Sequence, residues 1–433
     1  MIRKNKNRVI RKLFKHKDLQ SADVKAARSY IEKFWYNLER YQPDDKESAI
    51  GLPHPFLVPA YDVNATFNFD EMYYWDSYFM VQGMLNNPER KKLVMGILDN
   101  QLHLIKRYGM VPNATKTYLM GRSQPPLLTS LIFDVYEAYE LDLRWLEQAI
   151  GWAKQEYHNV WMGTKKPFDH QVYRGLSRYY DINVLNDLAE AESGWDMTTR
   201  FNRRCLEYLP VDLNCYLYKY EKDFQRAAEM LQLRDEAEEW KQAANKRKRT
   251  VNQLMWGKLR GFYFDYNYKR ERKSPVASLA AYTAMWSGLA TKEQAKMLVS
   301  GLSRFEFTGG LATTEDVVIK QALPQRMPTQ WAYPNGWAPL HFFVTQGLEK
   351  YGYHGVAERI VKKWLKTNLE TFHSKGIFLE KYNVVNIKKE PTEGVYPSQT
   401  GFGWTNAIFE RFCQDYIDTT NSAPRTDPGA ERG

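Results

Sequence analysis

The sequence predicts an all-α protein folded as one ring-shaped domain, and three observations support this. Apolar residues recur at helical spacing along most of the 433 residues. No run of alternating apolar and polar residues is long enough to predict a sheet. Five loops rich in Trp, Tyr, Asp, Glu, Asn and Gly separate the helical segments. The length alone would also suit two or three domains, but five similar loops favour convergence on one cleft.

The first helical pattern begins at Ser21, where Ser21 or Asp23 can cap it, and its apolar positions continue to Leu38. Residues 41–70 contain four prolines and predict an extended loop. A short strand is expected near 261–266. Further helices are expected at 76–86, 90–107, 125–157, 200–232, 234–256, 276–288, 292–304, 338–351, 354–371 and 402–418.

The net charge of +10 is concentrated at the N-terminus, because residues 1–20 hold eight Lys or Arg and one Asp. We expect a solvated, disordered basic tail at 1–20, one domain at 21–418 and a disordered tail at 419–433. The body is nearly neutral, and the basic residues of 234–249 follow acidic ones along a solvated helix. Nucleic acid is therefore not an expected partner.

The sequence lacks the motifs that are typical of several function classes. The three cysteines form no C-x-x-C pair, which argues against a disulfide framework or a zinc site and suits a reducing, cytoplasmic compartment. No apolar stretch is long enough to span a membrane, and no phosphate-binding glycine loop, HExxH or G-x-S-x-G motif occurs. We expect a cytoplasmic monomer without a metal or cofactor.

Carboxylates beside aromatic residues remain as the candidate chemistry. Asp76, Asp196, Glu380 and Glu393 each lie in an aromatic, glycine-containing segment. Glycoside hydrolysis needs one carboxyl as proton donor and a second to activate water or attack the sugar, while aromatic faces bind the sugar ring. The alternative for each carboxylate is a helix cap or an ion pair.

Six sequence blocks resemble the trehalase family, glycoside hydrolase family 37, in the family's order along residues 30–412. The segment TQWAYPNGWAP is similar to the second signature of that family, with Ala332 in place of its Asp. The segment FNFDEMYYWDSYF is similar to the first signature. The remaining blocks are GRSQPP (121–126), SGWDMTTR (193–200), LEKYN (379–383) and GFGWTN (401–406).

The resemblance implies an (α/α)6 barrel with its site at one mouth, and hydrolysis of a small saccharide with inversion. It implies Asp196 as the general acid and Glu380 as the general base, with about 6.5–9.5 Å between their carboxyls. We expect Trp195 and neighbouring acids to raise the pKa of Asp196.

The resemblance also assigns sugar contacts to residues of the same blocks. Each has a structural alternative as well, and Trp337 most of all. The assigned residues are Phe69, Trp75, Asp76, Asn113, Arg122, Gln124, Gly194, Gln330, Trp337 and Glu393.

The chain departs from the family pattern where the family binds the sugar. Asn68 stands for a family Arg, and the block Pro-Arg-Pro-Glu-Ser has no counterpart. Val395 aligns with a family Glu, with Glu393 two residues earlier, and VVNIKKEPTEG (384–394) replaces a glycine-rich lid.

Each lost charge-assisted hydrogen bond to a hydroxyl would cost about 1.5–3 kcal/mol, so the second sugar or aglycone can differ from that of trehalose. Arg174 or Arg178 are candidate replacements, and Lys388 or Lys389 could bind an acidic aglycone. Three hypotheses stay open: a trehalase, a glucosylglycerate or mannosylglycerate hydrolase on the same barrel, and a sugar-binding protein without hydrolysis.

Overall fold

The computed structural model describes residues 21–62, 68–316, 329–394 and 399–418. The two expected tails, 1–20 and 419–433, and Val395 lie outside these described residues. The division into one domain and two tails therefore stays a prediction.

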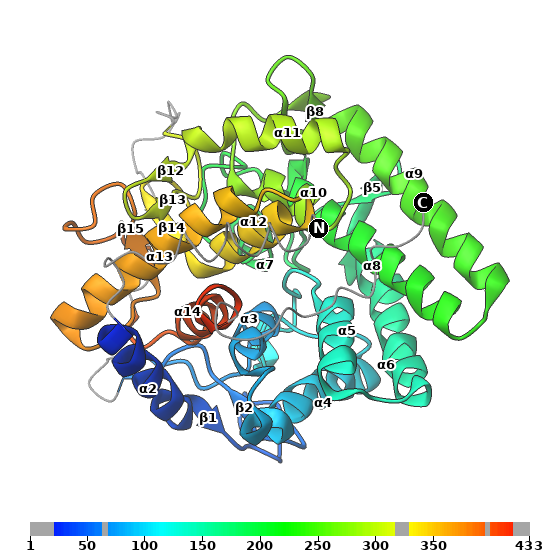
Figure 1. The fold of residues 1–433 in the computed structure, drawn as a ribbon. Coiled ribbons are helices and arrows are strands. Elements are labelled where there is room, and N and C mark those ends of the chain that lie inside the picture. The colour runs from blue at the N-terminus through cyan, green and yellow to red at the C-terminus, as the bar shows by residue number, and fades with distance from the viewer. Residues whose placement is uncertain (1–20, 63–67, 317–328, 395–398, 419–433) are drawn as a thin grey trace, which may run out of the picture.

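Helices form two concentric layers around one axis (Figure 1). The inner layer holds α3 (Tyr74–Met84), α5 (Leu128–Tyr139), α8 (Val211–Met230), α10 (Thr283–Trp286), α12 (Ala338–Lys350) and α14 (Gly403–Tyr416). The outer layer holds α2 (Ser21–Leu38), α4 (Lys91–Tyr108), α6 (Leu143–Glu156), α9 (Arg234–Met255), α11 (Lys292–Ser300) and α13 (His354–Lys375). The last inner helix, α14, packs against the first, α3, which closes the ring. The predicted all-α class and the (α/α)6 barrel are confirmed.

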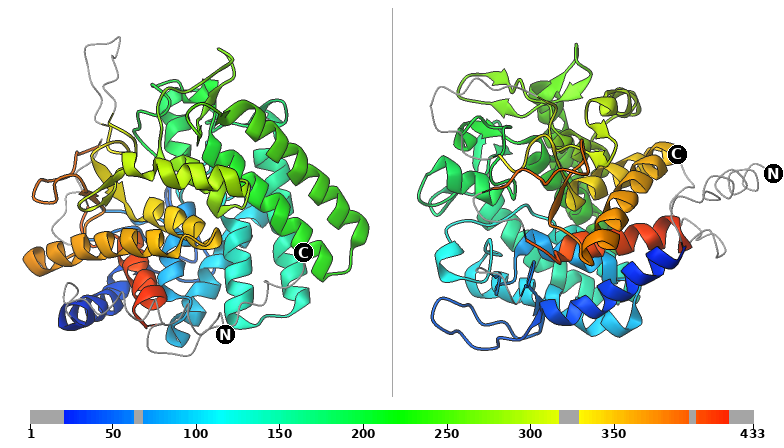
Figure 2. Two further views of the ribbon diagram at one scale, coloured as in Figure 1. Left: turned by 45° about the horizontal axis from the view of Figure 1, so that its top comes forward. Right: turned by 90° about the vertical axis from the view of Figure 1, so that its left-hand side faces the viewer.

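Burial explains which helices are inner and which are outer. Every residue of α3 is buried, including Asp76 and Gln82. The outer helix α9 buries mainly a stripe that includes Ala237, Ala244 and Val251, as expected of an amphipathic helix on a core. In the left view of Figure 2, α9 and α13 lie at opposite edges of the molecule.

Short strands brace the loops between helices, and each described strand has two or three residues. The pairing that bears most on the site joins β14 (Asn335–Trp337) to β15 (Lys381–Asn383) in antiparallel register. The others are β1 (Glu39–Arg40), β2 (Phe56–Leu57), β3 (Thr164–Lys165), β4 (Phe168–Asp169), β5 (Gln171–Tyr173), β6 (Leu176–Ser177), β7 (Tyr208–Leu209), β8 (Trp256–Gly257), β9 (Phe262–Tyr263), β10 (Tyr266–Asn267), β11 (Arg272–Lys273), β12 (Glu306–Phe307) and β13 (Gly310–Leu311).

Short helical turns complete the described elements. The helix α7 (Asn186–Glu192) leads into the loop that carries Asp196. The remaining turns are η1 (Pro88–Arg90), η2 (Thr117–Leu119), η3 (Tyr157–Trp161), η4 (Cys205–Glu207), η5 (Leu279–Tyr282) and η6 (Gly301–Arg304).

Three expected helices differ from the structure. The expected helix 276–288 consists only of the turn η5 followed by the short helix α10. The expected helix 125–157 is two helices, α5 and α6, because Glu140 adopts a left-handed conformation (φ 51°) that ends the first. The expected helix 200–232 is wrong over 200–210, because α8 begins at Val211, directly after Pro210. No helix in the described ranges is long and apolar enough to cross a membrane.

Candidate active site

A pocket lies at the N-terminal ends of α3 and α14, where loops distant in the sequence meet. Asp196 lines it together with seven of the ten residues assigned as sugar contacts. Six aromatic side chains form much of its wall, which suits the apolar faces of a sugar ring. The lining residues are Pro59, Phe69, Tyr73, Trp75, Asp76, Asn113, Leu119, Arg122, Gln124, Ala191, Gly194, Asp196, Trp331, Phe402 and Trp404.

The loop carrying Asp196 is pressed against α3. Gly194 has φ 72°, and a Cβ there would lie 2.7 Å from the ring of Trp75, so only glycine permits this approach. Gln330 Nε2 donates to the carbonyl oxygen of Asp196 at 2.5 Å. The loop is therefore fixed on two sides by neighbouring segments.

The environment of Asp196 favours its protonated form. Burial raises the pKa of Asp196 to about 7, and the charge of Glu380 contributes in the same direction. A carboxyl with such a pKa still holds its proton near neutrality, as a general acid must. The alternative interpretation as a helix cap does not hold, since α8 begins only at Val211.

Glu380 is held by the strand pairing between β14 and β15. Trp337 is the register partner of Lys381, and Lys381 Nζ lies 2.6 Å from Glu380 Oε2. Trp404 Nε1 donates to the carbonyl oxygen of Glu380 at 3.2 Å. Both side chains of the ion pair are completely buried, and Glu380 is not among the residues that line the pocket. The ion pair considered as an alternative for Glu380 is thus present.

Asp76 completes a cluster of three carboxyls. It is the third residue of α3, and Tyr73 holds the capping position, so Asp76 is not the helix cap. Burial raises the pKa of Asp76 well above its usual range, and the charges of Glu380 and Asp196 add to this effect. Carboxyls that share one buried region separate into protonated and ionised members, which is the division that acid and base roles require.

Polar residues of the 113–124 segment join the pocket loops to one another. Gln124 Oε1 accepts the backbone N–H of Trp75 at 3.0 Å. Asn113 Nδ2 donates to the carbonyl oxygen of Ser123 at 3.2 Å. Arg122 Nη1 donates to Asp181 at 3.1 Å, while Arg122 Nε is buried without a hydrogen-bond partner among the described residues. These side chains therefore help to build the pocket as well as line it.

Three of the assigned sugar contacts do not line the pocket. Gln330 is buried behind it and holds the Asp196 carbonyl. Trp337 stacks on Trp331 with 3.7 Å between ring centroids, so Trp331 is the ring that faces the pocket. Glu393 is exposed. The roles of these residues in binding stay predictions.

Asn68, the candidate replacements Arg174 and Arg178, and the lysines considered for an acidic aglycone also lie outside the pocket lining. The amide of Asn68 exchanges two hydrogen bonds of 2.9 Å with the backbone of Asp62. Arg178 pairs with Asp169 at 2.9 Å and donates to the carbonyl oxygen of Leu206. The exposed members of the set are Arg174, Lys388 and Lys389.

Some pocket residues were not singled out from the sequence. The most relevant are Tyr73, Trp331, Phe402 and Trp404. All four lie inside the quoted family blocks, so their aromatic character was an available signal. The other pocket residues, Pro59, Leu119 and Ala191, carry no side-chain chemistry that would have singled them out in the sequence.

A family model described as Trehalase matches residues 3–189 and 184–416 of the chain. The structure is similar to neutral trehalase Nth1 from Saccharomyces cerevisiae, with 28% identity and a TM-score of 0.72. That match covers 88% of this chain and 76% of the yeast chain.

A more distant match is the GH63 mannosylglycerate hydrolase from Thermus thermophilus in complex with glucose. It has 16% identity, a TM-score of 0.63, and coverage of 89% of this chain and 99% of that chain. The same hydrolase in complex with Tris and D-glycerate matches with 16% identity, a TM-score of 0.64 and the same coverage. At this identity the likeness supports the fold. Because the family model matches most of the sequence, the chain belongs to the trehalase family and is a glycoside hydrolase.

Proposed function

We propose that the chain hydrolyses trehalose or a related small α-glucoside, with Asp196 as general acid and Glu380 as general base. The observation that carries the proposal is the position of Asp196. Asp196 lines an aromatic pocket, and burial raises its pKa to about 7. The charge of Glu380 also acts to raise the pKa of Asp196. An inverting mechanism needs one carboxyl protonated and the other ionised at the same pH.

The role of Glu380 rests on its buried pairing with Lys381. Lys381 Nζ lies 2.6 Å from Oε2 of Glu380 and gives that carboxylate a buried counter-charge. The pocket between the carboxyl cluster and solvent would hold one sugar ring against Trp75, Trp331 and Trp404. Neighbouring polar side chains at Asn113 and Arg122 would then contact its hydroxyls.

The test is sugar release by Asp196→Asn and Glu380→Gln. Removing a general acid or base costs about 10²–10⁴-fold in rate, so each variant should lose at least 100-fold in kcat. Glu156→Gln is the matched control, because burial also raises the pKa of Glu156 to about 7, but Glu156 accepts hydrogen bonds from Tyr74 and Tyr220 away from the pocket. Full activity in both site variants would overturn the assignment.

A second candidate substrate is glucosylglycerate or mannosylglycerate. It is favoured by the altered recognition residues, such as Asn68, and by the structural likeness to a mannosylglycerate hydrolase. The panel is trehalose, glucosylglycerate, mannosylglycerate, maltose and kojibiose. Release from trehalose supports a trehalase, and release from a glycerate glycoside alone supports the second candidate.

The third possibility is sugar binding without hydrolysis. Binding of glucose or trehalose by calorimetry, together with no release from any member of the panel, would favour it over both hydrolase proposals.

A further inference from the structure

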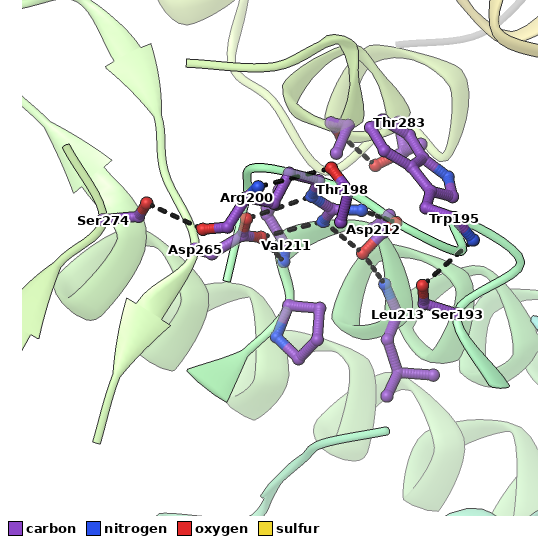
Figure 3. A network of polar contacts seen from close by, with 12 residues as sticks. Ser193, Trp195, Thr198, Arg200, Val211, Asp212, Leu213, Asp265, Ser274 and Thr283 are labelled. Atoms are coloured by element: carbon purple, nitrogen blue, oxygen red, sulfur yellow. Dashed lines mark hydrogen bonds and ion pairs between the residues drawn. The ribbon is translucent and has the colours of Figure 1, made fainter. Parts of the chain in front are cut away.

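Arg200 lies at the centre of a buried charge cluster next to the Asp196 loop (Figure 3). Its Nη1 and Nη2 donate to Asp212 at 2.7 and 2.9 Å. Its Nε and Nη2 donate to Asp265 at 3.1 and 2.9 Å. All three side chains are at most 1% exposed. Two bidentate pairs fix the plane of the guanidinium, which a lysine ammonium cannot reproduce.

The two carboxylates anchor Arg200 to separate parts of the scaffold. Asp212 is in the first turn of the inner helix α8, and Asp265 lies between β9 and β10. Asp265 Oδ1 also accepts the backbone N–H of Val211 at 2.9 Å, and Ser274 Oγ donates to the carbonyl oxygen of Arg200 at 3.1 Å. The guanidinium is thus fixed relative to the barrel rather than to its own loop.

The face of this fixed guanidinium supports the ring of Trp195. The Arg200 Cζ atom lies 4.2 Å from the centre of that ring, within range of a cation–π contact. On the pocket side, Trp195 stacks with Trp331 at 5.7 Å between centroids. Trp195 directly precedes Asp196, so the ring connects the charge cluster to the carboxyl through one peptide unit.

We propose that Arg200, clamped between Asp212 and Asp265, is a positioning residue that holds Trp195 and thereby keeps the Asp196 carboxyl in its productive place. This inference rests on the proposed function, in which Asp196 is the general acid. Arg200 is not among the residues lining the pocket, so it acts through Trp195 and not on the sugar.

The readout is the titration of Asp196, because loosening the loop admits water to its carboxyl. The charged and titratable groups that influence Asp196 are Glu380, Arg122, Lys381, Asp76, Tyr73 and Glu190. Arg200→Lys substitutes none of these groups and keeps the positive charge that acts on Glu190. A change in the titration would therefore report the position of Asp196.

The experiment follows Asp196 by NMR in the full chain labelled with 13C-aspartate, with Asp196→Asn identifying the signal. In Arg200→Lys the midpoint should fall by about one unit or more, because hydration favours the ionised carboxyl. The matched control is Arg247→Lys. Arg247 is also a buried arginine, paired with Glu221 at 2.8 Å, but it lies on α9, and its hydrogen bonds within the described residues reach no part of the loop. Its variant should leave the midpoint unchanged.

A folded Arg200→Lys protein with the wild-type midpoint would overturn the proposal. Should Arg200→Lys not fold, Asp265→Asn serves instead. It keeps the size of the side chain, removes half of the clamp, and should shift the midpoint in the same direction by less.

Kinetics separates this inference from the proposed function. Arg200→Lys should lower kcat at least tenfold with less than a threefold change in KM, because the sugar contacts are intact. A wild-type protein that hydrolyses nothing would defeat the proposed function while the NMR midpoint still decides the role of Arg200. Hydrolysis by the wild type with an unmoved midpoint in the variant would defeat the role of Arg200 alone.

Discussion

The segments that carry Asp196 and Glu380 surround their carboxylates in different ways. The Asp196 segment is a loop that lines the pocket, and it is held by backbone contacts and by the packing of Gly194 and Trp195. The Glu380 segment leads into a paired strand, and its carboxylate is completely buried against Lys381. Burial raises the pKa of Asp196 to about 7, although the charges of Arg122 and Lys381 act to lower it.

The two carboxyls therefore have different electrostatic environments. Desolvation raises the pKa of Asp196, whereas Glu380 has a buried counter-charge in Lys381. Removing the counter-charge of Glu380 should lower the stability of the protein, whereas removing the charge of Asp196 should raise it at alkaline pH. Three predictions test this comparison, from the largest expected effect to the smallest.

The largest effect is expected for Lys381→Met. The substitution leaves Glu380 buried without its cation, and breaking a buried ion pair in this way costs about 3–5 kcal/mol. Urea unfolding at pH 7 measures the loss in the free energy of unfolding. The double variant Lys381→Met with Glu380→Gln should recover part of it, because no unpaired charge remains. A single variant as stable as the wild type would contradict the importance of the pair.

The second effect is a gain in stability for Asp196→Asn at alkaline pH. The pKa of Asp196 is raised from 3.8 to about 7 in the folded state, so the stability of the wild type falls as pH rises through that window and stays lower above it. Asn carries no charge at any pH. The gain at pH 8 is up to about 4 kcal/mol, at about 1.36 kcal/mol per pKa unit, and it should vanish below pH 4.

Glu380→Gln is the matched comparison in the same urea titrations. It leaves Lys381 buried without its carboxylate and should destabilise the protein at pH 8. Destabilisation by Asp196→Asn at pH 8 would show that the folded protein does not hold this carboxyl in an unfavourable environment for charge.

The smallest effect is expected for Gly194→Ala. The new methyl group would meet Trp75 at 2.7 Å and should displace the Asp196 loop. Gly376→Ala is a close control, because Gly376 has nearly the same φ (71° against 72°) but nothing within 4 Å of the added Cβ. Both variants carry the left-handed backbone cost of about 1–2 kcal/mol, which unfolding measures. Only Gly194→Ala should also reduce kcat, by about tenfold for each 1.4 kcal/mol of lost positioning. Equal kcat in the two variants would contradict the role of the close approach.

Much of the fold could be predicted because helical periodicity is a local property. The patterns at 90–107, 234–256 and 354–371 match α4, α9 and α13 closely. The helix expected at 200–232 is wrong over 200–210, where buried ion pairs hold Arg200 and the turn η4 and strand β7 precede Pro210. Side-chain contacts with Asp265, more than 60 residues away, override local propensity there.

The sequence by itself determined the all-α class, the ordered family blocks and the two carboxylates proposed for catalysis. The helical class depends on the spacing of apolar residues, whereas the choice of the two carboxylates is what the resemblance of the blocks to the trehalase family implies. Only the tertiary structure decided that Trp331, rather than Trp337, faces the pocket, that Glu380 is paired with Lys381, and that Glu393 is exposed. These features depend on which loops meet at the ends of the inner helices, and burial and charge at that meeting point arise from residues far apart in the sequence.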